Sequence, residues 1–484
     1  MRFLFSIILA LVIQTAFGQT GYKLDFKIKG WKDTTVYLGY YFGESTFLKD
    51  TARVNSKGEF TFDGKKNLDQ GMYFLVLNKT RVFPEGFVIG NNQHFKMETS
   101  SDDYIKDMVV KGDDDNKLFF ENLLFTADRL REAEPFKKVL QDTTLKDEQK
   151  KKQAREGFSK VNDKVMAYQN NVIGQYPTTL TARILKAVRP IEIPDPPKKA
   201  NGNIDSSFQL KYYRQHFFDN YDLSDDAFLR MPKQFPSYQD KVKEYLEKLF
   251  LPQPDTITKA IDGLVAKAKK NPETYKYMVS TCAYLYQAPS IMGLDEVFVN
   301  IYTKYFASGE MDYWANAQYK KNLKEYADKL SRAQIGHTAP NLLMQDQNLQ
   351  PRSLYDIKKK YTIIYFFDPD CGHCRQESPK LVDFYNKNKT KYDLEVFAVS
   401  SDTSLQKLKN YIKEMKMTWI TVDGPRSYLK EHYTKLYYAE TFPTIYILDD
   451  KRKVIARKLP VEKLDEFLSN YEKFQKRKQP AGSK

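Results

Sequence analysis

A pair of cysteines three residues apart constrains this chain of 484 residues more than any other feature. The pair lies in Cys371-Gly372-His373-Cys374, and the chain has one further cysteine, Cys282. Two thiols at this spacing can meet on the first turn of a helix and interconvert between dithiol and disulfide. The residues before and after the pair decide whether the fold provides such a turn.

The flanking sequence predicts a strand–helix junction at the pair. Tyr361–Phe367 is an apolar run typical of a buried strand, Asp368-Pro369-Asp370 breaks it, and Arg375–Asn386 has a helical pattern. Cys371 then falls at the helix N-terminus, where free backbone N–H groups favour a thiolate. Cys374 lies one turn in and is more shielded. We therefore expect Cys371 to attack a substrate disulfide and Cys374 to resolve the mixed disulfide.

The residues inside and just before the motif tune its chemistry in opposite directions. His373 follows Gly372 and places an imidazole beside the thiolate, which stabilises the reduced form and favours an oxidant. Asp368 and Asp370 disfavour a thiolate at Cys371 if their carboxylates are close. The sequence leaves this balance open.

Strand and helix patterns alternate through the rest of the C-terminal region. Strands are predicted near Leu394–Ser400, Trp419–Val422, Thr444–Leu448 and Lys453–Arg457, and helices over Leu405–Met415 and Val461–Phe474. This alternation predicts an α/β sheet with helical crossovers.

Residues 334–475 resemble the thioredoxin-like fold of exported TlpA/ResA-type proteins, which is related to the AhpC/TSA family. The resemblance rests on pieces that occur in the family's order. They are Gly336-His337-Thr338-Ala339-Pro340-Asn341, the stretch Phe366–Cys374, Glu377 with Pro379, and Thr441-Phe442-Pro443-Thr444.

The resemblance implies that Pro443 is cis and that Pro443 and Phe442 shape a groove for the substrate chain beside the disulfide. Two departures from the family pattern affect the site. Asp370 stands where the family has tryptophan, and the preceding strand lacks a buried acid. Glu377 could take over proton transfer near Cys374, or it could be an ordinary exposed helix acid.

The resemblance further implies an enzyme, a thiol–disulfide oxidoreductase that exchanges disulfides with protein thiols and serves cell redox homeostasis. It implies no metal, flavin or nucleotide cofactor, and a membrane thiol carrier as the redox partner. Reductase work, such as keeping haem-binding cysteines reduced in cytochrome c maturation, is what the family suggests. Gly372-His373 favours oxidation or isomerisation instead, so the direction stays open.

Three other functions were weighed against this one. A zinc site needs four ligands, and the chain has no second CxxC and only five scattered histidines. A peroxidase of the same fold needs a threonine hydroxyl before its cysteine, which is absent here. The third is an envelope binding or scaffold protein whose thioredoxin domain is redox-sensing or structural, because most of the chain lies outside that domain.

The N-terminus predicts export. Arg2 precedes the apolar run Phe3–Ile13, and Ala16-Phe17-Gly18 supplies small residues for cleavage before Gln19. Residues 1–18 are thus expected to be a signal peptide, and the mature chain to reside in the periplasm or cell envelope of a Gram-negative bacterium. No later run is apolar enough to cross a membrane. The net charge of +15, from 77 basic and 62 acidic residues, is spread over helical faces and does not indicate nucleic acid.

The rest of the chain predicts two accessory domains, so the protein is multidomain. Residues 19–110 have short alternating runs typical of an antiparallel all-β sandwich, with His94 as a partly buried strand residue. Residues 111–333 have helical periodicity, and Cys282 among apolar neighbours is expected to be a small buried hydrophobe. Residues 334–475 form the thioredoxin-like domain, and 476–484 are a basic tail.

Overall fold

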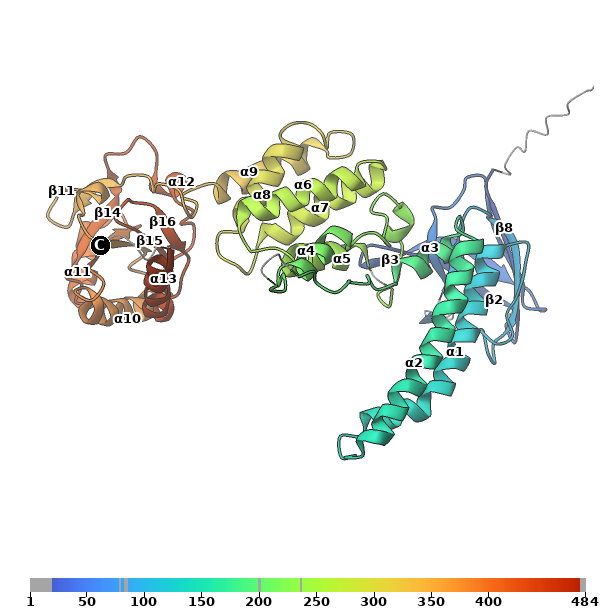
Figure 1. Cartoon of the computed structure of the whole chain (residues 1–484). Coiled ribbons are helices and arrows are strands. Elements are labelled where there is room, and N and C mark those ends of the chain that lie inside the picture. The colour runs from blue at the N-terminus through green and yellow to red at the C-terminus, as the bar shows by residue number, and fades with distance from the viewer. Residues whose placement is uncertain (1–19, 78–79, 82–85, 199–201, 236, 479–484) are drawn as a thin grey trace, which may run out of the picture. The chain divides into compact units, whose positions relative to one another are not determined.

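The computed structural model describes residues 20–77, 80–81, 86–198, 202–235 and 237–478 (Figure 1). The predicted signal peptide therefore lies outside the described residues. The chain divides into two compact units. Unit 1 contains the described residues up to Leu249 together with Ala266–Tyr275, and unit 2 contains Phe250–Val265 and the described residues from Lys276 onward. The predicted helical region is thus shared between the units.

The N-terminal part of unit 1 is β-rich, as predicted. Its strands are β1 (Tyr22–Lys29), β2 (Thr34–Phe42), β3 (Ser45–Val54), β4 (Glu59–Gly64), β5 (Gly71–Leu77), β6 (Thr80–Arg81), β7 (Phe87–Ile89), β8 (His94–Ser100) and β9 (Val109–Lys111). One sheet has the order β4-β1-β8-β9, and the other has the order β3-β2-β5-β6 with β7 on β5. Alternate residues of β1 are buried, which is the period expected of a strand with one face on a core.

The expectation of a wholly antiparallel sandwich was wrong at one pairing. Strands β1 and β8 run parallel, with Leu24 opposite Phe95. Parallel neighbours need a long connection between them, and here the strands of the second sheet supply it. Phe26 stacks on Phe60 of its own sheet and meets Phe87 of the other sheet edge-on, with ring centroids 5.4 Å apart. The aromatic core therefore lies between the two sheets.

Helices follow the strands in unit 1. They are α1 (Asp114–Gln141), α2 (Glu148–Gln175), α3 (Leu180–Ala187), α4 (Phe208–His216) and α5 (Tyr238–Lys248). Helices α1 and α2, each of 28 residues, run side by side as a hairpin (Figure 1).

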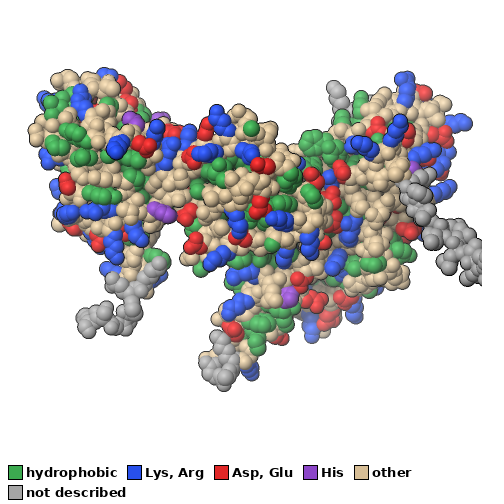
Figure 2. Space-filling view, turned by 90° about the horizontal axis from the view of Figure 1, so that it is seen from above, with side chains coloured by type: hydrophobic (Ala, Val, Ile, Leu, Met, Phe, Trp, Pro, Cys, Tyr) green, Lys and Arg blue, Asp and Glu red, His purple; other side chains and the backbone are tan. Residues whose placement is uncertain are grey.

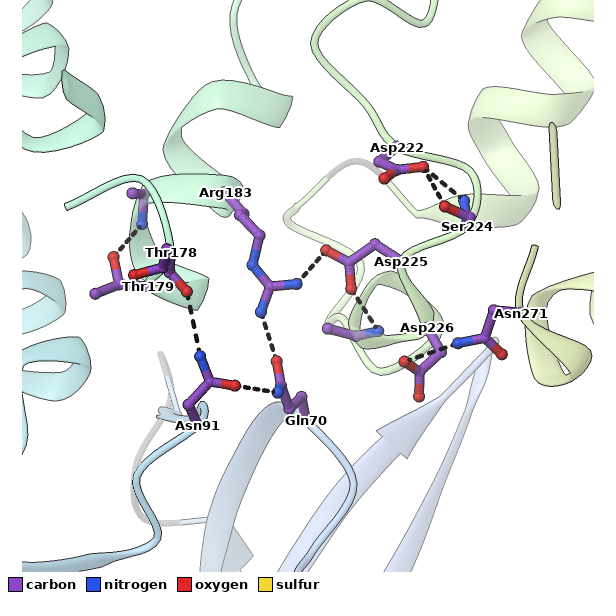
Figure 3. Close-up of polar contacts among 12 residues, drawn as sticks. Gln70, Asn91, Thr178, Thr179, Arg183, Asp222, Ser224, Asp225, Asp226 and Asn271 are labelled. Atoms are coloured by element: carbon purple, nitrogen blue, oxygen red, sulfur yellow. Dashed lines mark hydrogen bonds and ion pairs between the residues drawn. The ribbon is translucent and has the colours of Figure 1, made fainter. Parts of the chain in front are cut away.

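A polar network joins the β-rich part of unit 1 to its helices (Figure 3). Arg183 of α3 pairs with Asp225, and its Nη2 donates to Oε1 of Gln70 at 2.5 Å. Gln70 in turn donates to Oδ1 of Asn91 at 2.8 Å. Because Asp225 is buried, its pKa is raised, and the charge of Arg183 opposes that rise. The network therefore stabilises the charged form of the Asp225 carboxyl, which burial alone would disfavour.

The helical part of unit 2 contains the buried third cysteine. Its helices are α8 (Asp295–Ile301), a π-helical turn at Tyr302–Phe306, and α9 (Ala317–Leu330), while α6 (Pro254–Ala268) and α7 (Pro272–Gln287) span both units. Cys282 on α7 is fully buried, with its sulfur 3.9 Å from that of Met278. The prediction that it acts as a small hydrophobe is confirmed.

The C-terminal part of unit 2 has a sheet with the order β11-β10-β14-β13-β12-β15-β16. Its strands are β10 (Leu343–Asp346), β11 (Pro351–Ser353), β12 (Tyr361–Phe367), β13 (Leu394–Ser400), β14 (Ile420–Ser427), β15 (Thr444–Leu448) and β16 (Val454–Arg457). Strands β12, β13 and β14 are parallel, and the outer strands pair antiparallel. The predicted α/β architecture is therefore confirmed.

Helices cover both faces of this sheet. They are α10 (Gly372–Asn388), α11 (Leu405–Glu414), α12 (Tyr433–Leu436) and α13 (Leu464–Lys478). Ile363, Tyr365 and Phe367 of β12 pack under α10, α11 and α13. The alternate residues Ile364 and Phe366 face α12 and the segment before β12. Burial on both faces explains why β12 is apolar without interruption.

Arg457 at the end of β16 anchors this sheet to the helical part of unit 2. Its buried guanidinium donates to the backbone oxygens of Leu330 and Arg332 at 3.2 and 3.0 Å, and it pairs with Asp295. Burial lowers the pKa of Arg457 to about 10. A buried charge of this kind is held only because carbonyls and a carboxylate surround it.

Two expectations from the sequence concern the surface and the helices. The first is that the positive charge is spread over solvated faces, and the second is that no run is apolar enough to cross a membrane. Figure 2 shows lysine and arginine interspersed with aspartate and glutamate over the face in view. Such mixing is typical of solvated faces. Among the residues that the structure describes, none of the helices combines the length and the apolar character that a membrane crossing requires.

Candidate functional site

The junction between β12 and α10 positions the cysteine pair. Strand β12 is buried along its whole length, and the chain turns at Asp368, whose carbonyl oxygen accepts from the N–H of Cys371 at 3.1 Å. Cys371 has extended backbone angles at the N-cap of α10, and its side chain makes no capping hydrogen bond. The first N–H groups of α10 therefore keep their partial positive charge beside the Cys371 sulfur.

The Cys371 sulfur is partly exposed, and it faces the loop before β15. Its Sγ lies 3.5 Å from the backbone oxygen of Phe442. The peptide bond between Phe442 and Pro443 is cis, as the family resemblance implied. The structure thus brings Cys371, Phe442 and Pro443 together from segments 71 residues apart.

The Cys374 sulfur occupies a different environment one turn along α10. The side chain is fully buried, and its Sγ accepts from the backbone N–H of Asp368 at 3.5 Å. Burial raises the pKa of the Cys374 thiol to about 12, and the Asp368 N–H opposes that rise. Cys374 is thus a shielded, protonated thiol beside an accessible one, which is the asymmetry that a two-step exchange requires.

The two acids before Cys371 both have hydrogen-bond or ion-pair partners. Asp368 accepts from Ser401 Oγ at 2.6 Å and from the N–H of Asp370 at 2.8 Å. Asp370 pairs with Lys407 at 2.6 Å. The counter-charge of Lys407 therefore weakens the opposition of Asp370 to a thiolate at Cys371.

A groove of about 340 Å³ runs beside the cysteine pair, and we call it the active-site groove. Its lining includes His373, Glu377, Phe442, Pro443, Lys458 and Pro460. His373 and Gly372 are exposed at the start of α10. Except for Gly372 and the cysteines, every residue that the sequence predicted for the site thus lines this groove.

Glu377 is half-buried in the active-site groove and is engaged in ion pairs. Its carboxylate lies 2.6 Å from Lys380 Nζ, which also binds Glu462 at 2.5 Å. The proton-transfer role for Glu377 stays a prediction.

Three buried hydroxyl groups in the same core as Cys374 were not predicted from the sequence. Tyr365 OH lies 2.8 Å from Ser378 Oγ, and Ser378 Oγ lies 2.9 Å from Tyr411 OH. One signal was available. Ser378 follows Cys374 by four residues, so both lie on one helix face, and a serine on a buried face needs a polar partner.

Other places in the chain offer less defined chemistry. In the described part of the chain, no three His, Cys, Asp or Glu side chains are arranged to hold a metal ion. Unit 1 has a cleft of about 1100 Å³ beside the Arg183 network. Both acidic and basic side chains line it, among them Asp69, Asp222, Lys186 and Lys267.

Fold and site together define a thioredoxin-like domain with a CxxC dithiol at the N-terminus of a helix. Residues 335–457 match the AhpC/TSA family, which confirms the expected resemblance. Residues 22–119 and 141–329 match two domains of unknown function, DUF4369 and DUF5106.

Several similar proteins are named thiol–disulfide oxidoreductase or nucleoredoxin. Nucleoredoxin of Mus musculus is 30% identical over 128 residues, which cover 26% of this chain and 28% of that protein. Thiol-disulfide oxidoreductase ResA of Bacillus subtilis is 26% identical over 121 residues, covering 25% of this chain and 64% of ResA. This chain therefore spans less than two thirds of either relative.

One solved structure is a domain of a possible thiol-disulfide isomerase from Cytophaga hutchinsonii. It is 36% identical, with a TM-score of 0.29, and the match covers 31% of this chain and 99% of that domain.

Proposed function

We propose that this protein is an exported thiol–disulfide oxidoreductase that exchanges disulfides with protein thiols of the cell envelope. The observation that carries the proposal is the asymmetry of its two thiols. Cys371 is accessible at an uncapped helix N-terminus, whereas Cys374 is fully buried one turn away. An accessible attacking thiol and a shielded resolving thiol are the two parts that the exchange needs.

The reaction has two steps. The Cys371 thiolate attacks one sulfur of a substrate disulfide, and the other substrate sulfur leaves as a thiolate. Cys374 then loses its proton to solvent and attacks Cys371, so that the Cys371–Cys374 disulfide forms and the second substrate sulfur leaves. The substrate is reduced, and the protein is oxidised.

The active-site groove is where a substrate chain would lie. An extended chain beside Thr441 and Phe442 could bring its sulfur toward Cys371, whose Sγ is 3.5 Å from the Phe442 oxygen. A membrane thiol carrier would return the protein to its reduced form. We propose reduction as the net direction, with haem-binding cysteines of cytochrome c maturation among the substrates.

Trapping tests the exchange. The Cys374→Ser variant of the full chain should accumulate mixed disulfides with a protein disulfide such as insulin, because its Cys371 can attack but nothing resolves the product. The Cys371→Ser, Cys374→Ser double variant should form none. If the double variant reduces insulin as fast as the wild type, the protein is not an oxidoreductase and the binding or scaffold alternative stands.

The reduction potential tests the direction. Equilibration of the full chain with redox buffers should give a reduction potential of about −270 mV for a reductase. A value between about −180 and −120 mV would contradict the proposed direction and indicate an oxidant or isomerase.

A further inference from the structure

The three hydroxyls behind Cys374 form a chain that has one more donor than it uses. Tyr365 of β12, Ser378 of α10 and Tyr411 of α11 are at most 1% exposed. They share two hydrogen bonds, of 2.8 and 2.9 Å. Three hydroxyls carry three hydrogens, and each bond uses one. Within the described residues these oxygens have no other hydrogen-bond partner, so one O–H hydrogen is left over.

The geometry of α10 indicates where this hydrogen can go. Ser378 follows Cys374 by four residues, so the two side chains lie on the same face, one turn apart. Cys374, Tyr365 and Tyr411 pack in one core cluster. Burial raises the pKa of both tyrosines, and a negative charge on Cys374 raises it further.

We propose that this hydroxyl chain is a hydrogen-bond donor to the Cys374 sulfur when it becomes a thiolate. The inference rests on the proposed function, because Cys374 must ionise to resolve the mixed disulfide. A buried anion is costly unless donors surround it, and among the described residues the Asp368 N–H is the one donor that contacts this sulfur. The spare O–H supplies a second. The proton of Cys374 goes to solvent, and the hydroxyls keep theirs.

Neighbouring charged groups are engaged elsewhere. Asp368 binds Ser401 and the Asp370 N–H, and Arg375 pairs with Glu414 at 2.8 Å. Glu377 pairs with Lys380. Asp368 lies in the turn after β12, next to Cys374. Arg375 and Glu377 lie on α10 and Glu414 on α11, the helices that carry Ser378 and Tyr411. The Cys371 thiol is the remaining titratable group beside Cys374. None of them replaces the missing acid of the preceding strand as a direct partner of the Cys374 sulfur.

Dithiobis(nitrobenzoate) separates the two steps in the full chain. Cys371 attacks the reagent and releases one coloured thiolate, and Cys374 then attacks Cys371 and releases the second. All proteins would carry Cys282→Ala, so that only the motif thiols react. The test protein is the triple variant Tyr365→Phe, Ser378→Ala, Tyr411→Phe, because any two hydroxyls that stay bonded to each other would still leave one spare O–H.

The matched control is Tyr385→Phe, which removes a hydroxyl from the same core cluster, where it donates to Glu395 at 3.0 Å.

The triple variant should leave the first release unchanged and slow the second by about tenfold at pH 7, because a hydrogen bond to a charged group is lost. Its pH profile for the second release should move up by about one unit. Tyr385→Phe should change neither. If the second release and its pH profile match those of Tyr385→Phe, the inference is overturned. If the parent Cys282→Ala protein shows no second release, the proposed function fails as well.

Discussion

Helix α1 in unit 1 and helix α10 in unit 2 begin in opposite ways. Asp113 caps α1, where its carboxyl accepts from the backbone N–H and the side-chain amide of Asn116 at 2.8 and 2.7 Å. Cys371 stands at the corresponding position of α10, and its side chain makes no capping hydrogen bond. A helix start that serves structure is closed by an oxygen acceptor, whereas the start of α10 keeps its N–H groups available to a sulfur anion.

The comparison of the two helix starts predicts that the largest effect of a substitution is on disulfide exchange. Cys371→Ser should lower disulfide exchange with insulin by more than about a thousandfold, because serine caps the helix but is not a thiol nucleophile. Cys282→Ala should leave the rate unchanged, because Cys282 is fully buried in α7 with Met278 as its sulfur neighbour. A loss of exchange in Cys282→Ala would show that the third thiol takes part.

The second largest effect is on the stability of the fold, and it concerns Asp113 at the capped start of α1. Burial raises the pKa of Asp113 to about 6 from its usual 3.8, although Asn116 opposes the rise. A raised carboxyl pKa means that the folded state favours the protonated form. The contribution of Asp113 to the stability of the folded state is therefore complete below pH 4 and is lost as the pH rises through about 6.

Asp113→Asn keeps the acceptor oxygen and removes the titration. Relative to the wild type, its free energy of unfolding should therefore improve by up to about 3 kcal/mol between pH 4 and pH 7.5. Urea denaturation at both pH values measures it. Asp147→Asn, at the exposed start of α2, controls for losing a cap charge. If the free energies of unfolding of Asp113→Asn and the wild type differ by the same amount at both pH values, the pKa of Asp113 is not raised.

The sequence predicted the reactive helix start better than its surroundings. The bounds predicted for β12, β13 and β15 match the structure, because these central strands are continuous apolar runs between breakers. The short strands β10 and β11 at one side of the sheet were missed. They have only 4 and 3 residues, and β10 buries Asp346 as well as Met344, so no apolar run marks them.

The candidate site also has a part that the sequence predicted and a part that it could not predict. The cysteine pair could be predicted because strand, breaker, motif and helix are consecutive in the chain. The hydroxyl chain could not, because Tyr411 lies 33 residues from Ser378 and only the packing of α11 on α10 brings them together. The parallel pairing of β1 with β8 was unpredictable for a similar reason, since it depends on where the chain returns after building a second sheet.

A third effect compares two variants at the start of α10. Cys371→Ser should be more stable than Cys371→Ala by about 1 kcal/mol, because a serine oxygen can accept from the first-turn N–H groups. Ser404 does this at the start of α11, accepting from the N–H of Lys407. Neither variant can form the motif disulfide, so thermal unfolding compares the caps directly. Equal stability would mean that this helix start cannot accept a cap.

The smallest effect tests the acids beside the open helix start. Lys407 pairs with Asp370 at 2.6 Å and with Asp402 at 3.2 Å, and all three lie close to the motif. In Lys407→Ala these carboxylates lose their counter-charge, which disfavours the Cys371 thiolate. Alkylation of Cys371 by iodoacetamide at pH 7 should slow by about twofold to threefold at low salt, as befits an exposed pair.

The difference should nearly vanish in 1 M salt, where the screening length is only about 3 Å. Lys409→Ala on the same helix α11 removes an equal charge from an exposed position and should leave the alkylation rate unchanged. If the two variants behave alike, the acids before Cys371 do not act on its thiolate, and the open N-terminus of α10 governs its reactivity alone.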